Sequence, residues 1–380
     1  MPATDYQGSS STHSHPSPFS SFGRSLLSLR RDSPAAAAGA SPAMASGEEA
    51  DLEAFQRHVA AHLADLRGGE DELLSIEWIR RLLEAFLLCQ EEFRVVVALA
   101  RRRGALSAAA EKMVGDFYER AVKALDVCNA ARDGVDQVRR WERLAGIAAS
   151  VLLAPGEIHE GQLRRARKAL SDLSVLLIDD AAAAAGGGGV ASFLSSHRNR
   201  SFGRARAQLQ AIGSGLAAPR AHEGGLVAPV YSMGCLLHLA AWALVAAVPC
   251  PDRAAALQAH HLPAAPPRAA FPWAPPLLAL QERLTEEGKR KDRRNSCGLL
   301  KEIHALEKCT QRLAEAIDAA PVPLSGEREA EVREAAAELA AVCAAMRAGL
   351  EPLERQVREV FHRIVRSRME GLDSPMLNAD

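Results

Sequence analysis

Residues 224–251 form a run without a single Asp, Glu, Lys or Arg. Its centre, YSMGCLLHLAAWALVAAVPC at 231–250, is apolar on every side of a helix, which excludes an ordinary surface helix. As a helix, residues 228–248 would be about 31 Å long, which matches a hydrocarbon core of about 30 Å. The run is therefore either a membrane span or the central helix of a soluble bundle, and this choice constrains the whole fold.

The energetics of inserting this run into a bilayer are marginal. The Leu and Val side chains of 228–248 contribute roughly −2 to −4 kcal/mol on an insertion scale, where Ala is near neutral. Four residues oppose insertion: Pro229, Ser232, Gly234 and His238. A span would also separate the helices predicted before residue 224 from those after 276, although both groups carry apolar faces that need a partner. A core helix is therefore the favoured interpretation, and a span is the alternative.

Apolar residues recur at helical spacing through most of the chain. The predicted helical regions are 52–66, 79–96, 108–153, 158–178, 228–248, 299–317 and 327–369. Gly134 is a candidate break in the third region, and Pro352 should kink or divide the last. Aromatic residues make up only 4%, and no strand alternation of useful length occurs. The sequence therefore predicts an all-α fold, an elongated bundle of about seven or eight helices with coiled-coil-like heptads at 299–317.

Composition divides the chain into seven segments. Ser, Pro and Ala dominate residues 1–48, which we predict to be a disordered tail. The remaining segments are an N-terminal helical region (49–180), an Ala/Gly linker with an Arg-rich segment (181–223), the uncharged apolar helix (224–250), a Pro-rich loop (251–276), C-terminal helices that pack on the N-terminal region (277–371) and a tail (372–380).

The chain lacks the motifs that mark common enzymes, including GxSxG, the P-loop, GxGxxG, HExxH and the kinase signatures. Its seven cysteines include no CxxC pair, so they suggest free thiols and neither a zinc site nor a disulfide framework. A net charge of −1 gives no global attraction to nucleic acid. We therefore expect no enzyme activity, no cofactor, no metal and no nucleic-acid partner.

Basic clusters are the clearest local chemistry. HRNRSFGRAR at 197–206 has four arginines, no acid and no apolar stripe to bury, which is typical of a recognition segment. KRKDRR at 289–294 is either a solvated helix end, the favoured interpretation, or an import signal, an anionic-lipid patch or a docking site for an acidic partner. SFGRSLLSLRRD at 21–32 is a candidate docking motif. The candidate partner- or lipid-binding residues are Arg198, Arg200, Phe202, Arg204, Arg206, Lys289, Arg290, Lys291, Arg293 and Arg294, with Phe22, Arg24, Leu26, Arg30 and Arg31 in the N-terminal motif.

Several stretches, in order along the chain, resemble the plant BYPASS/ROH-like family, and its ROH-like branch in particular. They are MPATDYQGSS with SFGRSLLSLRRD, HRNRSFGR, WALVAAVPCPDR, KRKDRRNSCGLLKEI and VFHRIVRSRMEGLDSP. The likeness runs from the first residue to the last predicted helix. The Ala/Gly tract at 181–189 looks like a local expansion, and His238 stands where an apolar residue is expected in relatives.

The resemblance implies a non-enzymatic plant protein that acts in development. ROH-like members are associated with binding an exocyst subunit and restraining secretion, for instance of cell-wall or mucilage polysaccharide, which implies an exocyst subunit as the partner here. BYPASS-type members are linked to limiting a root-derived signal that affects shoot growth. The family brings no catalytic residues with it.

Three functional hypotheses follow. The favoured one is a helical adaptor at the cytoplasmic face of membranes. The second is a single-pass membrane regulator that spans through 228–248. Its N-terminal part would be cytoplasmic, because the arginines before the run (Arg204, Arg206, Arg220) outnumber those close after it (Arg253, Arg268). The third is a helical enzyme or small-molecule binder, which requires a deep pocket with convergent polar groups.

Overall fold

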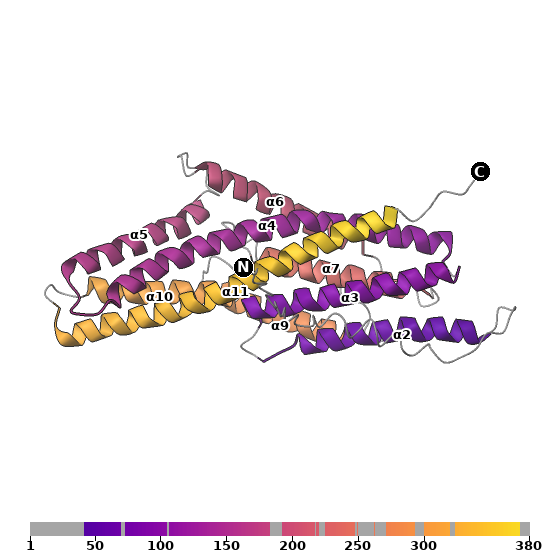
Figure 1. The fold of residues 1–380 in the computed structure, drawn as a ribbon, viewed down its shortest axis with the longest axis horizontal. Helices are drawn as coiled ribbons and strands as arrows, with labels where there is room; N and C mark the ends of the chain where they lie inside the picture. Colours follow the sequence, from indigo (N-terminus) through magenta and orange to yellow (C-terminus); the bar gives the residue numbers. More distant parts are fainter. Residues whose placement is uncertain are drawn as a thin grey trace, which may run out of the picture. The chain divides into compact units, whose positions relative to one another are not determined.

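The structure is a computed structural model that describes residues 42–69, 73–104, 106–182, 192–216, 218–219, 225–247, 249, 262, 271–292, 300–319 and 324–372. The chain divides into two units, Met1–Ser46 and Gly47–Asp380, and of the first only the beginning of one helix is described. Within the described residues the structure has nine helices and no strands (Figure 1), which confirms the predicted all-α class. The helices are α2 (Pro42–Asp65), α3 (Ile76–Arg102), α4 (Ala108–Leu152), α5 (Glu160–Ala182), α6 (Ser192–Ser214), α7 (Val227–Ala247), α9 (Ala274–Asp292), α10 (Lys301–Asp318) and α11 (Gly326–Leu372).

The two longest of these helices, α4 and α11, pack against each other in antiparallel orientation (Figure 1). Ion pairs join early residues of α4 to late residues of α11: Glu119 pairs with Arg368, and Arg139 pairs with Glu354 at 2.6 Å. With 45 and 47 residues, each helix is about 70 Å long at roughly 1.5 Å per residue. That length lets the pair contact different neighbours at its two ends.

At one end, the C-terminal part of α4 and the N-terminal part of α11 pack with α5 and α10 (Figure 1). Arg167 of α5 reaches across to Asp318 of α10, with 2.9 Å between Nε and Oδ1. At the other end, α6 and α7 pack on α4, and α3 packs on α11. There Arg363 of α11 pairs with Glu91 of α3 at 2.6 Å. The bundle therefore has two groups of helices that share α4 and α11.

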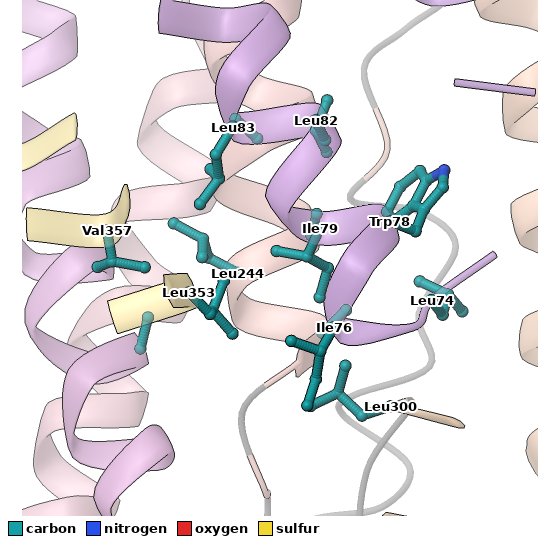
Figure 2. Close-up of a cluster of buried hydrophobic side chains, with 14 of the residues drawn as sticks. Leu74, Ile76, Trp78, Ile79, Leu82, Leu83, Leu244, Leu300, Leu353 and Val357 are labelled. Carbon is teal, nitrogen blue, oxygen red and sulfur yellow. The ribbon is translucent and has the colours of Figure 1, made fainter. Parts of the chain in front are cut away.

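The apolar helix α7 lies among α3, α4 and α6, and 94% of its most apolar 18-residue stretch is buried. Leu244 of α7 lies between Ile79 and Leu83 of α3 and Leu353 and Val357 of α11 (Figure 2). A small cavity of about 20 Å³ separates some of these side chains, so the packing here is nearly complete. Leu244 of α7 therefore contacts one helix that precedes residues 224–276 in the sequence and one that follows them.

The helices after residue 276 pack on those before residue 180, as the apolar faces of both groups require. α11 contacts α3 and α4, and α10 contacts α5 and α4. The backbone N–H of Lys301, at the start of α10, also donates to the carbonyl of Leu74, just before α3, at 3.0 Å. This arrangement places the sequence on either side of α7 in one packed body.

The Arg-rich segment at 197–206 belongs to α6, although we expected it to have no apolar stripe. Ala205, Leu209 and Ile212 are buried, and Phe202 is half-buried against the core. This stripe gives little signal in the sequence, because one of its members is a small alanine and arginines dominate the neighbouring positions. Arg200 and Arg204, which are four residues apart on the helix, are exposed, whereas Arg206 is half-buried.

The helix α9 was also absent from our prediction. It begins among prolines at Ala274, and proline is well tolerated in the first turn, where its missing N–H has no intrahelical partner. Its buried residues include Leu277, Leu280 and Leu284, and Trp273 immediately before the helix is buried as well. The helices α6 and α9 were both missing from the predicted helical regions, which is why the described residues contain more helices than expected.

Three expected boundaries differ from the structure. α2 begins at Pro42, so the predicted tail to residue 48 ends earlier; Pro and Ala are favourable in a first turn. α4 runs without a break through Gly134, which is buried against α7 and α11. α11 runs through Pro352 as one helix, because buried leucines on either side of that residue hold both halves against neighbours. The first 41 residues and the last eight lie outside the described residues.

Candidate functional site

The polar groups of α7, which oppose membrane insertion, are accommodated inside the bundle. Ser232 is fully buried and its hydroxyl donates to Oε1 of Gln56 on α2 at 2.9 Å. The same oxygen accepts from the indole Nε1 of Trp273 at 2.5 Å. Phe271 stacks on that indole with ring centroids 5.2 Å apart, and the ring of Tyr231 lies tilted beside it at 5.8 Å. One buried amide thus joins α2, α7 and the segment that leads into α9.

The contact between α6 and α7 depends on glycine. Gly213 of α6 lies against the imidazole of His238, and a Cβ added at Gly213 would be only 2.6 Å from Cε1 of that ring. Gly234 of α7 lies in the same way against the side chain of Leu216. Arg120 of α4 closes this contact by donating to the carbonyl of Gly215 at 3.0 Å. His238 is therefore part of a close helix crossing within the core.

The predicted cations of α6 lie on the surface beside α4. Arg200 and Arg204 are exposed, and Nη1 of Arg204 lies 4.0 Å from Oδ1 of Asp126 on α4. Gln208, one turn further along α6, donates to the other oxygen of Asp126 at 3.2 Å. Arg206 is half-buried. These residues share one helix, and Arg198 belongs to the same helix, although its side chain lies outside the description.

The second basic cluster begins at the C-terminal end of α9, where Lys289 is exposed. Arg290 and Lys291 belong to the helix, but their side chains are not described. The other predicted residues lie outside the described part of the chain: Arg293, Arg294, Phe22, Arg24, Leu26, Arg30 and Arg31. Of the three predicted clusters, only the α6 cluster can therefore be placed in a three-dimensional setting.

A groove that the sequence did not indicate lies between α4 and α11. It encloses a cavity of about 210 Å³. Its lining residues are Cys128, Asn129 and Arg132 of α4, and Glu354, Val357, Arg358, Phe361 and His362 of α11. We call this feature the α4–α11 groove. No local pattern could have revealed it, because it is created by the register in which two helices far apart in sequence pair.

The charged residues of the α4–α11 groove differ in exposure and in pairing. Arg132 and Arg358 stand at its rim, with side chains 56% and 59% exposed. Both carboxylate oxygens of Glu354 are engaged in ion pairs: Arg139 lies 2.6 Å from Oε2 and Arg358 lies 2.8 Å from Oε1. Burial acts to raise the pKa of Glu354, but these two guanidinium groups outweigh it and hold that pKa below its ordinary value. The carboxylate therefore stays ionised and paired.

The cysteines of the described residues are poorly suited to nucleophilic chemistry. Burial raises the pKa of Cys128, at the floor of the groove, to about 12, and does the same for Cys235. A thiol with such a pKa carries almost no thiolate at neutral pH, and the thiolate is the reactive form. Within the described residues no three His, Cys, Asp or Glu side chains gather as metal ligands. The chemistry that this surface offers is the binding of an anionic group.

Comparison with known proteins gives a consistent family assignment. The family model described as Protein ROH1-like matches residues 15–208 and 195–375. Protein ROH1D of Arabidopsis thaliana is 42% identical over 413 aligned positions, which cover 98% of this chain and 98% of that protein. Protein ROH1A of Arabidopsis thaliana is 32% identical, covering 86% of this chain and 90% of that protein. No solved structure matches the chain.

Proposed function

The chain belongs to the ROH1-like family, and on that premise we propose that it is a non-enzymatic helical adaptor that binds an exocyst subunit and restrains polarised secretion in plants. The secretion in question is the deposition of cell-wall or mucilage polysaccharide. In this proposal the protein acts from the cytoplasm, at the face of membranes where vesicles are tethered.

The observation that carries the adaptor proposal is the distribution of polar chemistry. The interior of the bundle is packed with apolar side chains, and some of its buried polar groups, such as Gln56, join one helix to another. Exposed cations lie on the outside of the bundle, among them Arg204 of α6 and Arg132 and Arg358 of the α4–α11 groove. A surface of this kind recognises partners, whereas catalysis needs perturbed acids, bases or nucleophiles gathered in a cleft.

We further propose that α7 stays inside the protein and does not cross a membrane. α7 is the one helix of the described residues that is long and apolar enough to do so. In a single-pass arrangement, however, α4 and α11 would lie on opposite sides of the bilayer, whereas they pack together along their length. Removing α7 from the bundle would also expose apolar faces of α3, α4 and α6 to water.

The second candidate is a single-pass membrane regulator that limits a root-derived developmental signal. The apolarity of α7 is the observation that favours it. A third candidate, an enzyme or binder of a small metabolite, has less support. The cavity of the α4–α11 groove, about 210 Å³, is below the range of about 300–1,000 Å³ that is usual for small-molecule sites.

The adaptor proposal is tested by affinity capture from plant extract with the tagged full chain as bait. We expect enrichment of an exocyst subunit, followed by direct binding of that purified subunit. An unrelated helical bundle of similar length and net charge serves as the control bait. Equal recovery of exocyst subunits on both baits, or failure of the purified subunit to bind, would contradict the proposal.

A further inference from the structure

We propose that the α4–α11 groove binds an acidic side chain, Asp or Glu, within an extended segment of a partner protein. This inference rests on the proposed adaptor function and adds to it the binding face and the chemistry that is recognised.

The first step of the argument is the charge available at the rim. Both carboxylate oxygens of Glu354 are in contact with a guanidinium, one with Arg139 and one with Arg358. Arg358 contacts Glu354 through a single nitrogen, and an arginine carries five N–H donors, so most of its donors remain for another acceptor. Arg132 lies 4.0 Å from Asp133, the next residue along the helix, which is a weak contact. The rim therefore has donors for an additional anion.

The second step is the shape of the groove between those arginines. Its floor is formed by Val357, Phe361 and the neutral thiol of Cys128, and Asn129 adds an amide at the wall. An apolar floor below a cationic rim suits a side chain whose methylene groups pack downward and whose carboxylate stays at the rim. The volume of about 210 Å³ suits one side chain with neighbouring backbone better than a whole small molecule.

The third step is the continuity of the groove with α6. Asn129 in the groove wall lies one helical turn beyond Asp126, the residue that Arg204 and Gln208 of α6 contact. One turn of helix advances about 5.4 Å. Arg204 of α6 therefore borders the same stretch of α4 that also contributes Asn129 to the groove. An extended acidic segment that enters the groove could reach Arg204 as well, which is why we infer a peptide and not a single ion.

The test measures binding of fluorescein-labelled peptides to the full-length protein by fluorescence anisotropy. The probe is a short peptide with a Glu-Leu-Phe-Glu centre, and its counterpart has a Gln-Leu-Phe-Gln centre. The protein variant combines Arg132→Gln with Arg358→Gln, which removes both rim charges without introducing repulsion. The matched control is Arg355→Gln, which removes an exposed charge of the same helix that does not line the groove.

We expect the acidic peptide to bind the unmodified protein and the Arg355→Gln control equally. The double variant should bind it about tenfold or more weakly, because hydrogen bonds to charged groups are lost. Circular dichroism verifies that the variant is folded. Equal binding of the acidic and neutral peptides, absence of binding by both, or unchanged binding to the folded double variant would overturn the proposal. Binding only to vesicles that contain phosphatidylserine, with no acidic-peptide binding, would also overturn it.

The same variants separate this inference from the adaptor proposal. If the purified exocyst subunit binds the double variant as well as the unmodified protein, the groove is not the site used, although the adaptor proposal stands. If the acidic peptide binds the groove but no exocyst subunit binds the chain, the groove inference stands and the adaptor proposal fails. Loss of both interactions in the double variant, with both retained in Arg355→Gln, supports the two together.

Discussion

Two glycines of α6 occupy opposite environments, and they show how single residues decide the packing of α7. Gly213 lies against the buried ring of His238, so that an added methyl group would lie 2.6 Å from Cε1. Gly203 lies in the same helix on an exposed face, with no atom near the position that a Cβ would take. The first glycine allows α6 and α7 to approach closely, whereas the second only weakens the helix.

Replacing each glycine by alanine should therefore change stability in opposite directions. Gly213→Ala should lower the free energy of unfolding by about 1–3 kcal/mol, because the core is overpacked. Gly203→Ala should raise it by up to about 1 kcal/mol, because alanine is the better helix former. Urea denaturation followed by circular dichroism measures both. Equal effects of the two substitutions would show that His238 does not lie against α6 as described.

The buried thiols lead to a second prediction at this scale. Cys128 and Cys235 have pKa values raised to about 12 by burial, whereas Cys309 is only half-buried. During iodoacetamide labelling at neutral pH, Cys309 should be modified well before Cys128 and Cys235. Mass spectrometry of the labelled peptides resolves the sites, and labelling in urea provides the reference for full accessibility. Rapid labelling of Cys128 in the folded protein would contradict the closed floor of the α4–α11 groove.

At the scale of the helix, Pro352 stands out because it lies inside the continuous helix α11. Proline removes one backbone hydrogen bond and its ring clashes with the carbonyl four residues earlier. Leu350 and Leu353 on either side are buried, so packing holds the helix together despite that cost. We infer that α11 would be intrinsically more stable without the proline.

Pro352→Ala should therefore stabilise the protein, by up to about 3 kcal/mol. Glu351→Ala, an exposed neighbour, should change stability by a few tenths of a kcal/mol at most and serves as the control. Differential scanning calorimetry gives both shifts in melting temperature. A destabilised Pro352→Ala variant would mean that a proline-dependent bend is needed for α11 to contact both groups of helices.

The long helices α4 and α11 could be predicted from the sequence, whereas α6, which buries only a short apolar stripe, could not. α4 and α11 carry large apolar residues at helical spacing over many turns, so their positions followed from periodicity. α6 buries Ala205, Leu209 and Ile212, a stripe in which alanine gives little signal. The continuity of α4 through Gly134 could not be predicted either, because packing from two neighbouring helices overrides the low helix propensity of glycine.

The candidate site was predictable only in part for the same reason. The arginines of α6 form a local cluster in the sequence, and in the structure Arg200 and Arg204 are exposed whereas Arg206 is half-buried. The α4–α11 groove depends on the pairing of Arg132 with a helix more than two hundred residues away in sequence. Such a site requires the register of two helices, which local sequence patterns do not contain.

At the scale of the molecule, α7 connects helices from both ends of the chain. Its sequence is too apolar for a surface helix and only marginally suited to a bilayer. In the structure the apolar side chains of α7 are buried by packing. The helices α3, α4 and α6 surround α7, and Leu244 also reaches Leu353 of α11. Burial in the bundle is our proposed explanation of the apolar run, and Ser232 of that run donates a hydrogen bond to Gln56 inside the bundle.

The most direct test of this account is alkaline carbonate extraction of membranes from plant cells that express the full-length chain. A core helix predicts that the protein is released into the soluble fraction, because only peripheral contacts hold it at the membrane. An integral membrane protein in the same preparation must stay in the pellet as the control. Retention of the chain in the carbonate-washed pellet alongside that control would contradict a buried α7 and favour the single-pass alternative.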